Sequence, residues 1–290
     1  MPPLTARATA KVNLTLRVAG RRRDGLHEIE SLVVFSDITD ELSLDPARPR
    51  GVEVHGPLRA VCGPATDNLV LKAAAALAAS IFDLKIGHFT LVKRIPVAAG
   101  LGGGSADAAA ALRLLAQANG LSLGDHRLRD AARTTGADVP VCLDPRPRIM
   151  RGIGDMLSEP LQLPQLSAVL VNPGVPLPTG DVFAAFDRGA RAPSSLPAPP
   201  SLDVRDELFA FLQAQPNDLE AAAISVQPVI GEILSVLGAL PSCRLARMSG
   251  SGATCFGLFE TPEAAARAAQ QLRGTYPAWW TEETTLGNAA

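Results

Sequence analysis

The feature that most constrains this chain is a glycine-rich turn between an expected strand and an expected helix. The strand is expected over 89–95, and Gly100-Leu101-Gly102-Gly103-Gly104-Ser105 follows it. Residues 106–118 are rich in Ala and lack Gly and Pro, which predicts a helix that ends at Asn119-Gly120. Glycines before a helix let backbone amides surround an anion, and the helix dipole favours negative charge there. The segment predicts a phosphate-binding turn, with a purely structural turn as the alternative.

Three common nucleotide-binding signatures do not fit this segment. A P-loop needs Lys and then Ser or Thr after its last glycine, and no Lys is present here. The dinucleotide fingerprint needs a third glycine where Ser105 stands. The HRD and DFG signatures of protein kinases are absent from the chain. A phosphate site at this turn would therefore be of a different class, and the purely structural turn stays open.

The composition describes a globular chain of nearly balanced charge. Its 290 residues include 27 Lys and Arg against 29 Asp and Glu, a net charge of −2, and 47% are hydrophobic. Coating nucleic acid or an anionic membrane needs a basic excess, so neither is expected as a partner. The four cysteines form no CxxC pair, which disfavours a zinc site and a disulfide framework. No signal peptide or membrane helix is expected, so we predict a cytoplasmic protein.

The remaining pattern mixes strands and helices without a βαβ rhythm, which favours the α+β class. Residues 6–18 alternate apolar and polar side chains, so Lys11 and Asn13 should lie on one polar face of a strand. The charged turn 21–25 and the apolar run 31–36 predict a hairpin. Further expected elements are a helix over 69–82 capped by Asp67 or Asn68, strands over 168–171 and 255–259, a helix with a capping box from Asn217 to Glu220, a helix over 264–272 and an exposed loop over 191–201.

Two charged residues complete a set suited to phosphoryl transfer. Asp138 enters an apolar run after Gly136-Ala137, where a helix cap or a solvated turn is the plainer alternative. Lys11 lies within the first strand, where an exposed lysine is the plainer alternative. A carboxylate can accept the proton of an attacking hydroxyl, and a lysine can balance developing charge beside bound phosphates. We therefore expect both residues near the glycine-rich turn.

Several motifs, in chain order, resemble those of the GHMP kinases, a family of small-molecule kinases. Segment 96–105 is similar to their second motif, 10–14 to their first, and Gly250-Ser251-Gly252 to their third. The resemblance covers most of the chain. It is closer to one branch, the kinases of a cytidine-diphosphate-linked methylerythritol in non-mevalonate isoprenoid synthesis. The segments that carry this closer match are 10–16, 23–28, 136–140 and 151–155.

The resemblance implies a two-domain α+β fold and an ATP-dependent reaction. The N-terminal domain, over 1–160, should bind ATP and resemble the second domain of ribosomal protein S5. The C-terminal domain, over 161–290, should be ferredoxin-like. ATP with Mg²⁺ would phosphorylate the 2-hydroxyl of the cytidyl substrate. The protein would be a monomer or a weak homodimer.

The resemblance also implies roles for residues that match the family's motifs. Lys11 and Asp138 match the catalytic pair. The implied ATP-binding residues are Pro96, Val97, Ala98, Ala99, Gly100, Leu101, Gly102, Gly103, Gly104, Ser105 and Ala106, with Asn68 and Lys93 near the base. The implied substrate-binding residues are Asn13, Leu26, His27, Thr179 and Phe183.

Three positions depart from the family pattern. Leu26 stands where the family has Tyr, which leaves Phe183 as the ring available for cytosine. Ala106 replaces a second Ser, so Ser105 is the one candidate hydroxyl for a phosphate or a metal. Asp155 replaces Glu, and no metal role is assigned to it.

Two alternatives remain open from the sequence. One is another GHMP kinase, acting on homoserine or mevalonate, and the other is a non-catalytic nucleotide-binding protein of the same fold. His27 favours the cytidyl substrate because an imidazole can bond a cytosine edge. The presence of both Lys11 and Asp138 speaks against a simple binder, which needs no base.

Overall fold

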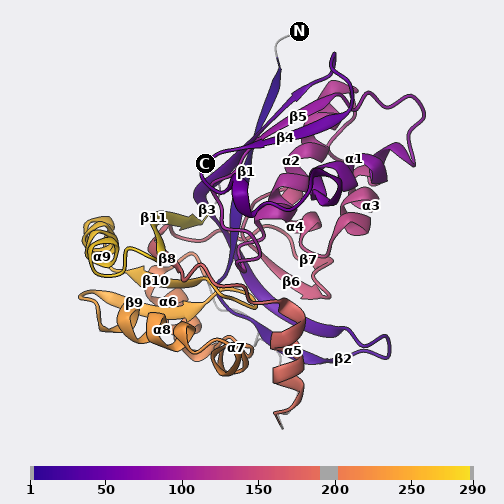
Figure 1. Ribbon diagram of the computed structural model, residues 1–290. Coiled ribbons are helices and arrows are strands. Elements are labelled where there is room, and N and C mark those ends of the chain that lie inside the picture. Colours follow the sequence, from indigo (N-terminus) through magenta and orange to yellow (C-terminus); the bar gives the residue numbers. More distant parts are fainter. Residues whose placement is uncertain (1–2, 190–201, 288–290) are drawn as a thin grey trace. The chain divides into compact units, whose positions relative to one another are not determined.

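The computed structural model describes residues 3–189 and 202–287, which form two compact units (Figure 1). Unit 1 contains 3–11, 38–97 and 102–145, and unit 2 contains 12–37, 98–101, 146–189 and 202–287. Strands β1 (Leu4–Asn13) and β3 (His27–Asp45) contribute residues to both units. The expected loop over 191–201 lies outside the described residues, and the expected domain boundary at residue 160 stays a prediction.

Unit 1 combines a small sheet with a group of helices. Strand β5 (His88–Val92) pairs in parallel with β4 (Gly51–His55) and antiparallel with the end of β3, where Glu41 lies opposite Val92. The short turns η1 (Arg59–Val61) and η2 (Ala65–Asp67) follow β4. Four helices pack against one another (Figure 1): α1 (Leu69–Ala78), α2 (Gly103–Ala118), α3 (His126–Thr135) and α4 (Val139–Leu143).

Helix α2 is the buried centre of this group. Its alanines from Ala108 to Ala111 are fully buried, and so are Leu112 and Leu115. Alanine has no atoms beyond Cβ, so α1 and α4 approach the backbone of α2 closely. The expected helix over 106–118 is confirmed, and it begins three residues earlier, within the glycine-rich turn.

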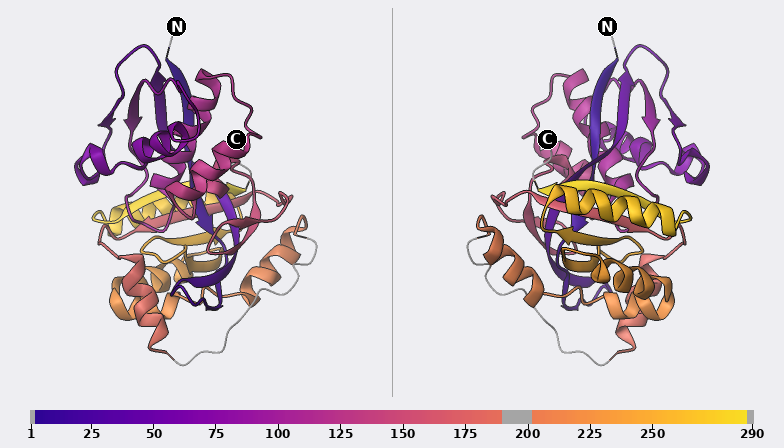
Figure 2. Two further views of the ribbon diagram at one scale, coloured as in Figure 1. Left: turned by 90° about the vertical axis from the view of Figure 1, so that its right-hand side faces the viewer. Right: turned by 90° about the vertical axis from the view of Figure 1, so that its left-hand side faces the viewer.

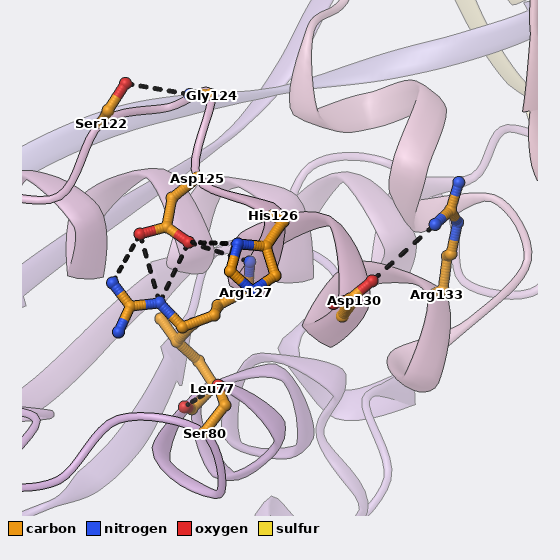
Figure 3. A network of polar contacts seen from close by, with 9 residues as sticks. All are labelled: Leu77, Ser80, Ser122, Gly124, Asp125, His126, Arg127, Asp130 and Arg133. Atoms are coloured by element: carbon orange, nitrogen blue, oxygen red, sulfur yellow. Dashed lines mark hydrogen bonds and ion pairs between the residues drawn. The ribbon is translucent and has the colours of Figure 1, made fainter.

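Two helices of unit 1 begin with side-chain caps. Asn68 Oδ1 accepts a hydrogen bond from Val70 N at the start of α1, which decides between the two expected caps. Asp125 Oδ1 accepts from Arg127 N at the start of α3 (Figure 3). Hydrogen bonds from Arg127 hold the pKa of Asp125 well below its ordinary value. In both helices the side-chain cap therefore determines where the helix begins.

Unit 2 contains a ferredoxin-like arrangement of strands and helices. Four antiparallel strands stand in the order β11 (Trp280–Gly287), β8 (Leu166–Asn172), β10 (Cys255–Phe259) and β9 (Cys243–Met248). Helix α8 (Val229–Ala239) precedes β9, and α9 (Pro262–Thr275) joins β10 to β11 (Figure 2). Chain order β8-α8-β9-β10-α9-β11 is the split βαβ pattern. The expected C-terminal topology is confirmed.

The core of unit 2 lies between these strands and helices. Val169 and Val171 of β8 pack in one cluster with Ile233 and Leu237 of α8 and Ala268 of α9. The other elements of this unit are β2 (Arg17–Arg21), β6 (Arg148–Gly152), β7 (Met156–Leu157), α5 (Thr179–Asp187), α6 (Arg205–Ala214) and α7 (Glu220–Val226). β2 pairs antiparallel with β3, which confirms the predicted hairpin.

The expected polar face of the first strand is wrong. Regular pairing stops at Asn13 and resumes at Arg17, and Thr9, Lys11, Asn13 and Thr15 are all buried. Both sides of this segment are covered, so its polar groups are satisfied internally. Asn13 Nδ2 donates to Ser31 Oγ over 2.7 Å, and Thr15 Oγ1 accepts from Leu32 N over 3.0 Å.

The expected capping box at Asn217 is also wrong. Helix α7 begins at Glu220, and Asn217 Nδ2 instead donates to the carbonyls of Met248 and Gly250. Glu220 Oε2 accepts from Met248 N over 2.9 Å. Asn217 Oδ1 does accept a local bond from Leu219 N over 3.0 Å, but Leu219 precedes α7, so this bond closes a turn before the helix. The Glu220 carboxylate, which a capping box would use locally, bonds to the distant Met248 N. The other expected elements appear as α1, β5, β8, β10 and α9, but α1 ends at Ala78 instead of 82 and β5 ends at Val92 instead of 95.

Candidate active site

The expected proximity of Lys11 and Asp138 is confirmed. Lys11 Nζ lies 3.3 Å from Asp138 Oδ2, within unit 1. Lys11 is 3% exposed, whereas the Asp138 side chain is 36% exposed. Asp138 precedes α4 but makes no side-chain capping bond to it. The carboxylate is therefore held by a buried cation and still reaches solvent, as a base that meets a substrate must.

The glycine-rich turn lies directly against this lysine. Gly102 has φ of +62°, which favours glycine, and a Cβ there would stand 3.1 Å from Lys11 Cε. The first intrahelical bond of α2 runs from Ala106 N to Gly102 O. The amides of Gly103, Gly104 and Ser105 precede it and have no acceptor within the helix. These amides form the positive end of a helix beside a buried lysine, which is suited to a phosphate.

A buried charged network lies beneath the same turn. Lys93 Nζ donates to Asp40 Oδ2 over 2.5 Å and to Asp107 Oδ2 over 2.7 Å. Asp40 Oδ1 accepts from the backbone amides of Arg94 and Ile95. A Cβ at Gly103 would stand 3.1 Å from Lys93 Nζ and 3.0 Å from Ile95 Cγ2. The network thus fixes the position of the turn from inside unit 1.

Burial shifts the pKa values of this network. Burial alone would lower the pKa of Lys93, but Asp107 and Asp40 together raise it above its ordinary value. Burial raises the pKa of Asp107 to about 7, against the opposing effect of Lys93. Asp107 Oδ1 is buried and has no hydrogen-bond partner in the described part of the chain. Burial and the neighbouring Asp40 therefore favour the protonated form of Asp107.

In unit 2, the first part of the glycine-rich segment contacts two other motifs. Ser249 Oγ donates to Gly100 O over 3.0 Å and accepts from Asn13 N over 3.0 Å. Thr254 N donates to Ala99 O over 3.1 Å. A Cβ at Gly100, whose φ is +75°, would stand 2.5 Å from Ser249 O. The same Cβ would stand 2.8 Å from Gly252 O, so the structure brings together, within this unit, pieces of all three segments that resemble GHMP motifs.

Two of the expected substrate residues of unit 2, His27 and Phe183, belong to one polar and aromatic cluster. The rings of His27 and Phe183 stack with centroids 4.4 Å apart and an interplanar angle of 18°. His27 Nε2 lies 2.7 Å from Asp187 Oδ1, and Arg21 Nη1 lies 3.2 Å from Asp187 Oδ2. Leu26 is 50% exposed, so the alternative that it faces the core is wrong.

The remaining expected residues have the following positions. Thr179 begins α5, and its Oγ1 lies 2.9 Å from Ser251 Oγ of the third motif. Asn68 caps α1 and Lys93 is buried in the charged network, so the side-chain oxygen of Asn68 and the ammonium of Lys93 already have protein partners. In the expected ATP segment, Ala99, Leu101 and Ala106 are buried and Val97 is exposed. Ala98, two residues after Pro96, has a positive φ of +52°.

Sequence reasoning missed Asp40, Asp107 and Asp187. Asp107 follows the glycine-rich turn by two residues, so its place at the helix start was a usable signal. Asp187 is four residues after Phe183, which places both on one helix face. Asp40 has no local signal, because its partner Lys93 is 53 residues away.

No protein-only metal site is found among residues 3–189 and 202–287: these hold no group of three or more His, Cys, Asp or Glu arranged for an ion. Mg²⁺ keeps several waters and commonly binds substrate phosphates, so it does not need such a group.

Burial raises the pKa of the Cys142 thiol to about 12, so this cysteine is an unreactive core residue. In the part of the chain that the structure describes, no helix has the length and apolar character to span a bilayer.

Comparisons with known proteins identify the family. The model of the GHMP kinase N-terminal domain matches residues 68–144, and that of the C-terminal domain matches 204–278. The chain is 52% identical to the 4-diphosphocytidyl-2-C-methyl-D-erythritol kinase of Xanthobacter autotrophicus, over 99% of this chain and 100% of that protein. It is 54% identical to the kinase of the same name from Methylobacterium radiotolerans, with the same coverage.

A solved structure agrees with these relatives. The crystal structure of a 4-(cytidine 5'-diphospho)-2C-methyl-D-erythritol kinase matches with a TM-score of 0.77 and 34% identity, over 99% of this chain and 100% of that one. The family expected from the motifs is thereby confirmed, together with the α+β class. The chain belongs to the GHMP kinase family of small-molecule kinases.

Proposed function

We propose that this protein transfers the γ-phosphate of ATP to the 2-hydroxyl of 4-diphosphocytidyl-2-C-methyl-D-erythritol, in non-mevalonate isoprenoid synthesis. The observation that carries the proposal is the Lys11–Asp138 pair beside Gly102, in a chain similar along its whole length to kinases of that substrate. The proposal includes a cytoplasmic location and a monomer or weak homodimer, and sedimentation tests the oligomeric state.

Asp138 is the general base in this mechanism. Its partly exposed carboxylate accepts the proton of the 2-hydroxyl as that oxygen attacks the γ-phosphorus. Lys11, 3.3 Å away, orients the carboxylate and offsets the negative charge that develops on the transferred phosphoryl group. The lysine is buried, so this interaction acts in a lower dielectric than water.

The amides of Gly103, Gly104 and Ser105 hold the ATP phosphates at the start of α2. Ser105 is the candidate hydroxyl for Mg²⁺, which when bound neutralises phosphate charge. Asn68 and Lys93 lie on the same unit, with Lys93 fixing the turn through Gly103.

The cytidyl group binds at the His27–Phe183 stack in unit 2, with Leu26 next to His27 in the chain. His27 bonds the cytosine edge, Phe183 supplies the aromatic face, and the exposed Leu26 adds apolar surface. Thr179 and Asn13 complete the substrate-binding set, each within the hydrogen-bonded cluster around the third motif.

The experiment is an ADP-release assay of the wild type with the cytidyl substrate, homoserine and mevalonate. We expect turnover with the cytidyl substrate, and turnover with one of the others alone would refute the proposal. Asp138→Asn should lower kcat by about 100-fold or more while ATP still binds. Asp130→Asn is the matched control, because Asp130 is an exposed carboxylate on α3 of the same unit. Near-normal turnover of Asp138→Asn would remove Asp138 from the mechanism.

A further inference from the structure

Asp187 occupies an unfavourable position for the helix that carries it. It is the last residue of α5, where the negative end of the helix dipole disfavours a carboxylate. The side chain is instead engaged outside the helix: Oδ1 lies 2.7 Å from His27 Nε2 and Oδ2 lies 3.2 Å from Arg21 Nη1. The carboxylate therefore bonds to Arg21 of β2 and His27 of β3 and makes no stabilising contribution to α5.

This contact determines which nitrogen of His27 carries hydrogen. A carboxylate can only accept a hydrogen bond, so Nε2 is the donor. In a neutral imidazole the other nitrogen, Nδ1, is then an acceptor. Arg21 Nη1 lies 3.2 Å from the other oxygen of Asp187, so the carboxylate is held between the guanidinium and the imidazole. Stacking on Phe183 holds the ring plane.

We propose that Asp187 is the positioning residue that makes His27 Nδ1 a hydrogen-bond acceptor for the nucleobase. The inference rests on the proposed function, because it concerns the same cytidyl site. A base bonded in the plane of the imidazole lies parallel to the Phe183 ring. The 4-amino group of cytosine donates to this acceptor, whereas the 4-oxo group of uracil meets it with another acceptor. Asp187 thus selects cytosine over uracil through His27.

The test is Asp187→Asn, which keeps the size of the side chain. An amide can accept from Nε2 or donate to it, so both tautomers of His27 become available. We expect the preference for CDP over UDP as competitive inhibitors to fall by about tenfold. The KM for the cytidyl substrate should rise between about twofold and tenfold. Both kcat and the KM for ATP should stay within about twofold, because the base is remote from the transferred group.

Two variants complete the experiment. Glu28→Gln removes the same charge from the exposed residue beside His27, whose side chain points to the other side of β3, and should leave the preference unchanged. Asp187→Glu keeps a carboxylate and should retain more of the preference than Asp187→Asn. The inference is overturned if Asp187→Asn retains the full preference, or if Glu28→Gln loses it equally. A wild type that neither turns over the cytidyl substrate nor prefers CDP refutes the proposed function itself, which separates the two failures.

Discussion

The charged network of unit 1 predicts that Asp107→Asn changes how stability depends on pH. Lys93, Asp40 and Asp107 are each at most 3% exposed, and one ammonium faces two carboxyl groups. With both carboxyl groups ionised, the network would bury a net negative charge, which is costly. Burial accordingly raises the pKa of Asp107 from 3.8 to about 7.

The sign follows from the proton bound to Asp107. Between pH 4 and pH 7 the folded protein keeps a proton that the unfolded chain has released. This contribution to stability is fully present below pH 4 and is lost as the pH rises through about 7. A gap of about three pKa units corresponds to about 4 kcal/mol in the free energy of unfolding. Asn cannot titrate, so Asp107→Asn does not suffer this loss.

The measurement is urea unfolding of both proteins between pH 4 and pH 8, followed by circular dichroism. The free energy of unfolding of Asp107→Asn, minus that of the wild type, should increase by about 4 kcal/mol over this range. Asp130→Asn, exposed on α3, should show a difference that stays nearly constant. A constant difference for Asp107→Asn, or one that falls with pH, would refute the assignment of the proton to Asp107.

Three further predictions follow from contacts described above. Lys93→Met leaves two buried carboxyl groups without their cation, so the free energy of unfolding in urea at pH 8 should fall by about 3–5 kcal/mol. Lys72→Met, on the exposed surface of α1, is the control and should change it by less than about 0.5 kcal/mol. Gly103→Val places side-chain atoms against Ile95 and Lys93, so the free energy of unfolding should fall by about 1–3 kcal/mol and calorimetric titration should show weaker ATP binding. An unchanged Kd for ATP would contradict the phosphate site. Leu26→Tyr should lower the KM for the cytidyl substrate by up to about tenfold without lowering Tm, because Leu26 is half exposed, and a constant KM would place the base elsewhere.

Local patterns predicted the parts of the site whose signals are local. The glycine-rich turn stood next to the helix that it begins, and Asn68 stood beside the helix that it caps. Lys11 and Asp138 were paired by chemistry and by the family resemblance, and the structure places them 3.3 Å apart. The period-2 pattern predicted the first strand but not the burial of its polar face. Alternation reports the two faces of a strand, and here both faces are covered.

Long-range pairing accounts for what the sequence could not show. Asp40 meets Lys93 across 53 residues, and His27 meets Asp187 across 160. The side-chain oxygen of Asn217 accepts from the nearby Leu219 N, as its sequence context suggests, yet its amide group donates to carbonyls more than 30 residues away. In each case the residue type suggested a polar role, but the sequence could not show which partner it would bond, because partner choice depends on the tertiary fold.

The alanine content of α2 has a consequence for the motion of its phosphate-binding end. Buried alanines such as Ala109 and Ala110 have no rotamers to lose, so enclosing this helix costs backbone entropy alone. Amides in its middle should exchange with deuterated solvent only through large openings of unit 1, at rates set by global unfolding. Those of Gly103 and Gly104 should exchange far faster, because they precede the intrahelical bonds. A nucleotide that slows exchange at these two amides, with little effect on Ala109 and Ala110, would be docking onto a turn already held in place.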